Sequence, residues 1–188
     1  MRVFILLLSA LLLLPALVFA RDGVKQGVAA YRPKAGETVL KLEIEGRGDV
    51  YILLHTKEAP KATTHVLGLV KSGFYDGQKF HRVENSPRPY LVQIGDPKSK
   101  TGDLSGSGGS GAHIPFEESG FTNVAGAVGL ARPVNNADGG DSQFYILLDR
   151  SSFLDGNYTV FGMVVGGMDV LKKVEKGDQV LRVTAIAG

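Results

Sequence analysis

Strand-like runs follow one another along most of this chain, and their succession is the feature that most restricts its fold. Eight segments are rich in apolar and β-branched residues, and turn-forming residues border most of them. The regular alternation of strand and helix that builds a parallel sheet is missing from the sequence. The pattern predicts a mainly β fold, a closed eight-stranded antiparallel barrel. The predicted strands are residues 38–45, 50–55, 79–84, 90–95, 125–131, 143–148, 158–165 and 180–186.

Two segments between the strands have the pattern of helices. Residues 60–73 begin at Pro60, carry apolar residues at helical spacing and end at Gly73, as an amphipathic helix does. Residues 168–174 predict a second, shorter helix. We expect these two α-helices to cap the open ends of the barrel.

The first 20 residues have the pattern of a cleaved signal peptide. Arg2 precedes an apolar run over residues 3–14, and small residues end the segment at Ala20. The alternative is a membrane anchor, but the run is shorter than the roughly 20 apolar residues that span a bilayer. We therefore expect an exported protein, periplasmic or secreted, without stable membrane association after cleavage. Residues 21–36 would form a flexible N-terminal segment and residues 37–188 one folded domain.

Composition excludes several classes of partner. The formal net charge of the 188 residues is only +2, and no run of basic residues points to nucleic acid. There is no cysteine, so the chain has no disulfide bond and depends on packing for its stability. Nothing in the sequence indicates an oligomer, and we expect a monomer.

Several motifs do not support cofactor or metal chemistry. Residues 106–111, "GSGGSG", match the G-x-G-x-x-G pattern, but neither the preceding strand nor the following helix of a dinucleotide site is present. The four histidines are scattered, and no pair has metal-ligand spacing. His81 is interpreted as a strand residue with a satisfied side chain rather than as a catalytic base. We therefore expect no cofactor and no metal.

Three polar side chains interrupt the apolar strands. Arg82, Gln93 and Gln143 each lie in a run that otherwise favours burial, and buried cations and amides need partners. They either line one water-filled groove or occupy three unrelated surface positions. Spacing alone does not decide between these alternatives.

Four short motifs carry a resemblance to a known family. "FHR" (80–82), "VQIGD" (92–96), "SQFYI" (142–146) and "FLDGNYTVFG" (153–162) resemble, in order and spacing, the cyclophilin-type peptidyl-prolyl cis–trans isomerases. The resemblance covers residues 38–186. It implies an isomerase of X–Pro bonds whose partners are proline-containing polypeptides, bound in a groove on the outside of an eight-stranded barrel.

The resemblance also implies roles for eleven residues. Arg82 is similar to the catalytic arginine of the family, and Gln93 and Gln143 are similar to the amides that hold the substrate backbone. Ala131 and Arg132 resemble the edge segment that pairs with the peptide. The apolar walls of the proline pocket would be Tyr90, Leu91, Tyr145, Phe153 and Leu154, with Tyr158 at the position of a pocket-closing histidine.

The chain departs from the family pattern in its pocket and in one loop. Phe153 replaces a common Trp, Tyr158 a common His and Tyr145 a common Phe, which puts tight binding of cyclosporin-type inhibitors in doubt. Residues 83–89 are about three residues longer than is usual for the family. A non-catalytic module that binds proline peptides, or a chaperone, is the alternative function that we keep.

Overall fold

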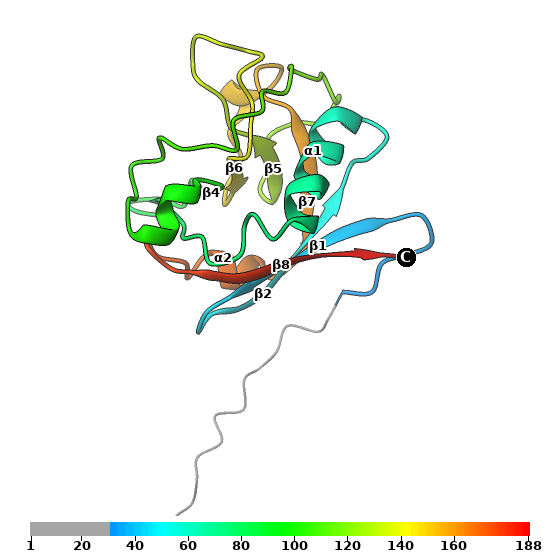
Figure 1. Ribbon diagram of the computed structural model, residues 1–188. Coiled ribbons are helices and arrows are strands. Elements are labelled where there is room, and N and C mark those ends of the chain that lie inside the picture. The colour runs from blue at the N-terminus through cyan, green and yellow to red at the C-terminus, as the bar shows by residue number, and fades with distance from the viewer. Residues whose placement is uncertain (1–30) are drawn as a thin grey trace, which may run out of the picture.

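The computed structural model describes residues 31–188 (Figure 1). The predicted signal peptide lies outside the described residues. The last part of the predicted flexible segment is attached to the domain, because the Tyr31 hydroxyl and the Lys34 amide donate to the Glu37 carboxylate at 2.9 and 2.8 Å. Within residues 31–188, none of the helices has the length and apolarity needed to cross a membrane.

The fold is mainly β, and all eight predicted strands are present as one antiparallel sheet. Each strand overlaps its predicted range, with ends that differ by at most three residues. The strand order in space is β3-β4-β6-β5-β7-β2-β1-β8. The strands are β1 (Thr38–Ile44), β2 (Gly48–Leu54), β3 (Arg82–Glu84), β4 (Leu91–Ile94), β5 (Ala127–Leu130), β6 (Phe144–Leu147), β7 (Val160–Gly166) and β8 (Val180–Ala187).

The prediction of a closed barrel is wrong, because the sheet curls without closing. The two edge strands, β3 and β8, share no ladder. Residues 77–80, just before β3, make backbone hydrogen bonds of 2.8–3.0 Å to residues 177–180 around the start of β8. A three-residue β3 is too short to extend this contact into a ladder, so the result is a half-barrel.

Two α-helices accompany the sheet, as predicted, and both are shorter than expected. Helix α1 (Pro60–Lys71) packs against β8, and α2 (Met168–Leu171) packs against β2. Figure 1 shows α1 on the viewer's side of the curled sheet. The carboxylate of Glu117 accepts hydrogen bonds from two backbone amides in the first turn of α1, so a distant loop caps this helix.

The sheet buries apolar side chains on both of its faces. The inner face carries the main core, in which the Phe144 ring packs edge-on against Tyr75 and Phe161 at centroid distances of 5.6 and 5.9 Å. A second, smaller cluster of buried side chains lies on the outer face: Leu91, Ala127, Tyr145, Leu147, Leu154 and Val160. The inward and outward residues alternate along β4 and β6, as the pleat requires. Two 3₁₀ turns, η1 (Pro97–Thr101) and η2 (Ser152–Leu154), lie in the long connections.

Candidate functional site

A row of four residues crosses four neighbouring strands on the outer face of the sheet. Arg82 on β3 is paired with Gln93 on β4, Gln93 with Tyr145 on β6, and Tyr145 with Gly129 on β5. Residues directly opposite each other in an antiparallel ladder project from the same face. The fold therefore places a cation, an amide and an aromatic ring side by side from three different strands.

A cavity of about 310 Å³ opens over this row. Ten of the eleven residues that the resemblance singled out line it: Arg82, Tyr90, Leu91, Gln93, Ala131, Arg132, Tyr145, Phe153, Leu154 and Tyr158. The eleventh, Gln143, lies outside this cavity but accepts a hydrogen bond from Gln93 at 2.8 Å. Arg82, Gln93 and Gln143 are therefore neighbours, and this excludes the alternative that they occupy three unrelated surface positions.

The guanidinium of Arg82 lies at the rim of the cavity and is held at two points. Its Nε donates to Glu84 Oε1 at 2.6 Å, and its Nη1 donates to Gln93 Oε1 at 3.3 Å. The side chain is 45% exposed, because β3 is an edge strand. The desolvation that would make a buried guanidinium costly is therefore largely avoided.

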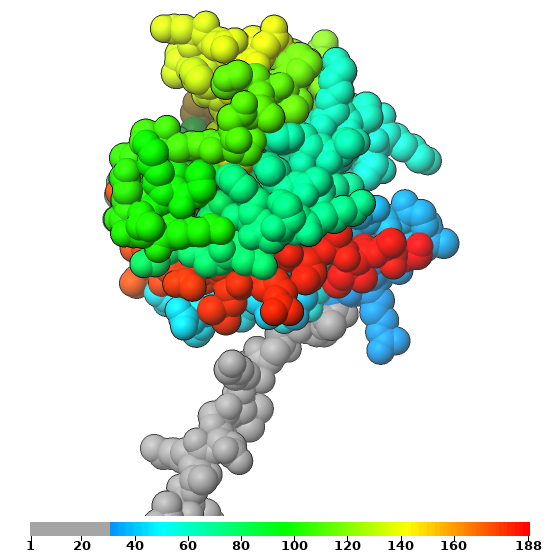
Figure 2. All heavy atoms as spheres, viewed as in Figure 1, coloured from blue at the N-terminus to red at the C-terminus, as the bar shows by residue number. Residues whose placement is uncertain are grey.

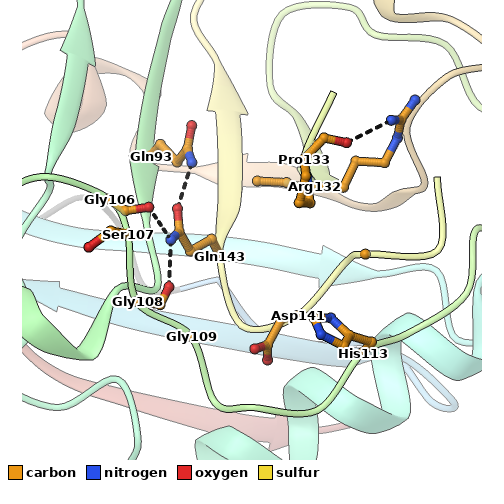
Figure 3. Close-up of a pocket in the computed structure, with 12 residues that line it drawn as sticks. Gln93, Gly106, Ser107, Gly108, Gly109, His113, Arg132, Pro133, Asp141 and Gln143 are labelled. Carbon is orange, nitrogen blue, oxygen red and sulfur yellow. Dashed lines mark hydrogen bonds between the residues drawn. The ribbon is translucent and has the colours of Figure 1, made fainter. Parts of the chain in front are cut away.

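A chain of amide hydrogen bonds continues from Gln93 into the glycine-rich loop. Gln143 donates from Nε2 to the carbonyl oxygens of Gly106 and Gly108 at 2.8 and 2.7 Å (Figure 3). The loop also packs closely against Asp96, since a Cβ on Gly108 would lie 2.2 Å from a carboxylate oxygen of that residue. The segment that matched a dinucleotide motif thus forms a wall beside the site.

A second cavity, of about 390 Å³, adjoins the first and shares Gln93, Ala131 and Arg132 with it. Figure 3 shows Gln143 and the loop on one side of this cavity and Asp141 and His113 on another. Asp141 accepts hydrogen bonds from the Ser110 hydroxyl and from the Gly111 amide, the latter at 2.9 Å, and so anchors the loop. The two cavities together form an extended groove.

Aromatic side chains build the apolar part of the first cavity. The rings of Tyr90 and Phe153 lie 6.1 Å apart, and Tyr145 and Tyr158 pack edge to face at 5.8 Å. The guanidinium of Arg132 lies 4.7 Å from the centre of the Tyr158 ring, a cation–π contact that fixes this wall. Phe153 is 69% exposed, so a large apolar surface faces solvent at the mouth.

Tyr145 forms the floor of the cavity and is fixed by its hydroxyl. This hydroxyl donates to Asn123 Oδ1 at 2.7 Å, and both side chains are buried. Burial raises the pKa of Tyr145 far above its usual range, and it also raises the pKa of Tyr90. Both phenols stay uncharged at any physiological pH, and the charge that borders this pocket comes from arginine.

Three residues that shape the site were not predicted from the sequence. Val134 lines the cavity and is 82% exposed, on the segment that Figure 2 shows in yellow at the top of the molecule. Asn123 lies in irregular chain, and Glu84 is the last residue of β3, before the long loop, so neither had a motif to identify it. Ala131 lines the cavity as expected, but its amide already donates to the Gln143 carbonyl at 2.9 Å.

His81 differs from its interpretation as a satisfied strand residue. It is only 4% exposed, it does not line the cavity, and neither ring nitrogen has a hydrogen-bond partner in the part of the chain that the structure describes. Burial lowers the pKa of this imidazole and keeps it neutral. Among residues 31–188, no three histidine or acidic side chains gather closely enough to hold a metal ion.

The structure thus combines an open curled sheet with an apolar hollow on its outer face, beside an arginine and two glutamines. The family model described as "Cyclophilin type peptidyl-prolyl cis-trans isomerase/CLD" matches residues 39–186. The chain belongs to this family and is a peptidyl-prolyl cis–trans isomerase (EC 5.2.1.8).

Curated relatives agree with this assignment, and a solved structure shares the fold. A "Probable peptidyl-prolyl cis-trans isomerase" of Brucella suis is 37% identical over 171 residues, which cover 87% of this chain and 83% of the relative. "Peptidyl-prolyl cis-trans isomerase 10" of Caenorhabditis elegans is 36% identical over 133 residues, covering 68% and 76% of the two chains. A cyclophilin-type isomerase structure from Cryptosporidium parvum has the same fold, with a TM-score of 0.70 and 22% identity over 81% of this chain and 99% of its own.

Proposed function

We propose that this isomerase acts on X–Pro bonds of exported polypeptides and assists their folding outside the cytoplasm. The signal-peptide pattern of residues 1–20 supports the compartment, and residues 37–188 would form the folded enzyme. The proposed enzyme works as a monomer, without stable membrane association after cleavage. A structure of the Cryptosporidium parvum protein was determined in the presence of the dipeptide Ala-Pro, which supports an X–Pro segment as the occupant of the cavity here.

The row of Arg82, Gln93 and Tyr145 is the observation that carries the proposed mechanism. Rotation about an X–Pro bond is slow because amide resonance gives a barrier of about 18–20 kcal/mol. In the transition state the bond is twisted, and the prolyl nitrogen regains a lone pair that accepts a hydrogen bond. Only an interaction that is stronger with the twisted amide than with the planar one accelerates the reaction.

Arg82 has the donors for this role. A guanidinium has five N–H groups, and two of those on Arg82 are engaged by Glu84 and Gln93. The remaining three make no hydrogen bond within residues 31–188, so the substrate can use them at the rim of the cavity. The proline ring would pack against the aromatic walls, while Gln93 and Gln143 hold the peptide backbone. This chemistry needs neither a nucleophile nor a bound metal.

The test is an NMR exchange measurement of a proline-containing peptide with the mature chain. Removing a hydrogen-bond donor that stabilises the transition state raises the activation free energy by roughly 2–4 kcal/mol in other enzymes. A half-exposed donor contributes less. We therefore expect Arg82→Ala to lower kcat/KM at least about tenfold, with an unchanged circular dichroism spectrum. A rate within about twofold of the wild type would refute the role of Arg82.

The same measurement separates the isomerase from a binding module or chaperone. Either of those alternatives would bind the peptide without accelerating its exchange, so rate and affinity must be measured together. The compartment is tested separately by expressing the full chain in a bacterium that exports proteins. We expect the periplasmic fraction to contain a chain that begins at Arg21, and an intact leader in the cytoplasm would contradict the proposal.

A further inference from the structure

Glu84 makes the shortest polar contact of the Arg82 guanidinium, and it does so from outside the cavity. The two residues are separated by one position on β3, so their side chains project from the same face of the sheet. Arg82 Nε donates to Glu84 Oε1 at 2.6 Å. Glu84 is not among the residues that line the cavity.

The backbone of Glu84 is itself fixed to the wall of the cavity. Its carbonyl oxygen accepts a hydrogen bond from the Tyr90 amide at 2.8 Å, which closes the long loop between β3 and β4. The backbone that carries the Glu84 carboxylate therefore has a defined position beside the pocket. The guanidinium is held at Nε by Glu84 and at Nη1 by Gln93, and two contacts on different nitrogens of a planar group define its orientation.

We propose that Glu84 is a positioning residue that holds Arg82 in the orientation needed for catalysis. The inference rests on the proposed function of Arg82. An arginine on an exposed edge strand has several rotatable bonds, and most of its conformations do not place a donor at the prolyl nitrogen. If the donor is already fixed when the substrate binds, less conformational entropy is lost in reaching the transition state.

A purely stabilising role is a poor explanation for this ion pair. Both side chains are 45% exposed, and ion pairs this open to water contribute little to folding because solvent screens them. A role opposite to the proposed one is that the carboxylate neutralises Arg82 and slows the reaction. The two roles predict changes of opposite sign when Glu84 is removed.

The experiment measures kcat and KM for a prolyl peptide with Glu84→Ala and Glu84→Gln. We expect Glu84→Ala to lower kcat about three- to tenfold with KM within about twofold, and Glu84→Gln to recover most of the rate, because its amide oxygen can still accept from Nε. The matched control is Glu175→Ala, which removes a carboxylate from an exposed pair with Arg47, and Glu175 is not among the residues that line the cavity. We expect this control to keep the wild-type rate.

Three outcomes would overturn the inference. An unchanged or faster Glu84→Ala enzyme removes the positioning role, and a Glu84→Gln enzyme as slow as Glu84→Ala assigns the effect to charge instead of orientation. The double variant Arg82→Ala, Glu84→Ala should be no slower than Arg82→Ala alone, because Glu84 acts through the guanidinium. A further loss in the double variant would show that Glu84 acts elsewhere. An Arg82→Ala enzyme as fast as the wild type would instead refute the proposed role of Arg82.

Discussion

Gly129 is the glycine in the row of residues that crosses four strands. Because it has no side chain, there is room for Tyr145 at the floor of the pocket. Tyr145 lies across it from the neighbouring strand. A Cβ atom built on Gly129 would lie 2.1 Å from both Cζ and Oη of Tyr145. Gly129→Ala is therefore a small change that acts directly on the site.

The size of the effect follows from this distance. Carbon atoms in contact lie about 3.5 Å apart, so the ring of Tyr145 would have to move by roughly 1.4 Å. Overpacking of this kind costs about 1–3 kcal/mol. Losing the Tyr145 hydrogen bond to the buried Asn123 would add about 1–3 kcal/mol. We expect the free energy of unfolding to fall by about 2–6 kcal/mol.

Activity should fall by more than the loss of folded protein explains. A shift of about 1 Å in a binding surface can cost as much as 100-fold in rate, so we expect kcat/KM to drop at least about tenfold. Both quantities are measured by urea unfolding and by NMR exchange at a temperature where the variant is folded. Gly68→Ala is the matched control, since Gly68 lies on α1 with no atom within 4 Å of its added Cβ.

The control should change stability in the opposite direction. Alanine is favoured over glycine inside a helix by about 0.5–1 kcal/mol, so Gly68→Ala should stabilise the chain and leave the rate unchanged. A Gly129→Ala enzyme that is as stable and as active as Gly68→Ala would show that Tyr145 has a second position compatible with catalysis. Tyr145 would then not be a fixed floor of the pocket, and the reasoning from its contact with Gly129 would be refuted.

Three further changes test other parts of the structure. Tyr145→Phe leaves the buried oxygen of Asn123 without its donor and should lower the free energy of unfolding by about 1–3 kcal/mol in urea, while most isomerase activity remains because the ring is kept. Burial lowers the pKa values of His55 and His81 below 6.5, so below that pH the unfolded chain binds protons that the folded chain does not. Stability to urea should therefore fall as the pH drops below about 6.5, and His55→Phe should reduce this dependence. Glu117→Ala removes the cap of α1 and should lower the thermal midpoint, with a cost of about 0.5–2 kcal/mol.

Local patterns in the sequence were sufficient to locate every strand. Alternation marked β1, and continuous apolar runs marked β6 and β7, because side-chain periodicity follows directly from the backbone. Closure of the sheet was not predictable in this way. It depends on how far β3 extends beside β8, and no local pattern records the pairing of strands so far apart in sequence.

The site was predictable where a motif carried it and unpredictable where loops supply it. Arg82, Gln93 and Tyr145 lie on strands, so strand register fixes which of their side chains meet. Val134 and Asn123 enter the site from irregular chain, whose path depends on tertiary contacts. Glu84 was hidden for another reason: a charged residue on an exposed strand is common, and only the 2.6 Å contact with Arg82 distinguishes it.

The strand "QFYIL" shows how the sequence already contained a second apolar surface. A strand with one face in water alternates apolar and polar residues, but Phe144 to Leu147 are all buried. Phe144 and Ile146 fill the inner core, while Tyr145 and Leu147 belong to the cluster under the cavity. A continuous apolar run in an antiparallel sheet therefore requires a cover on the outer face as well. Here the cover includes Leu154, and Tyr145 also lines the cavity in which we propose that the proline ring binds.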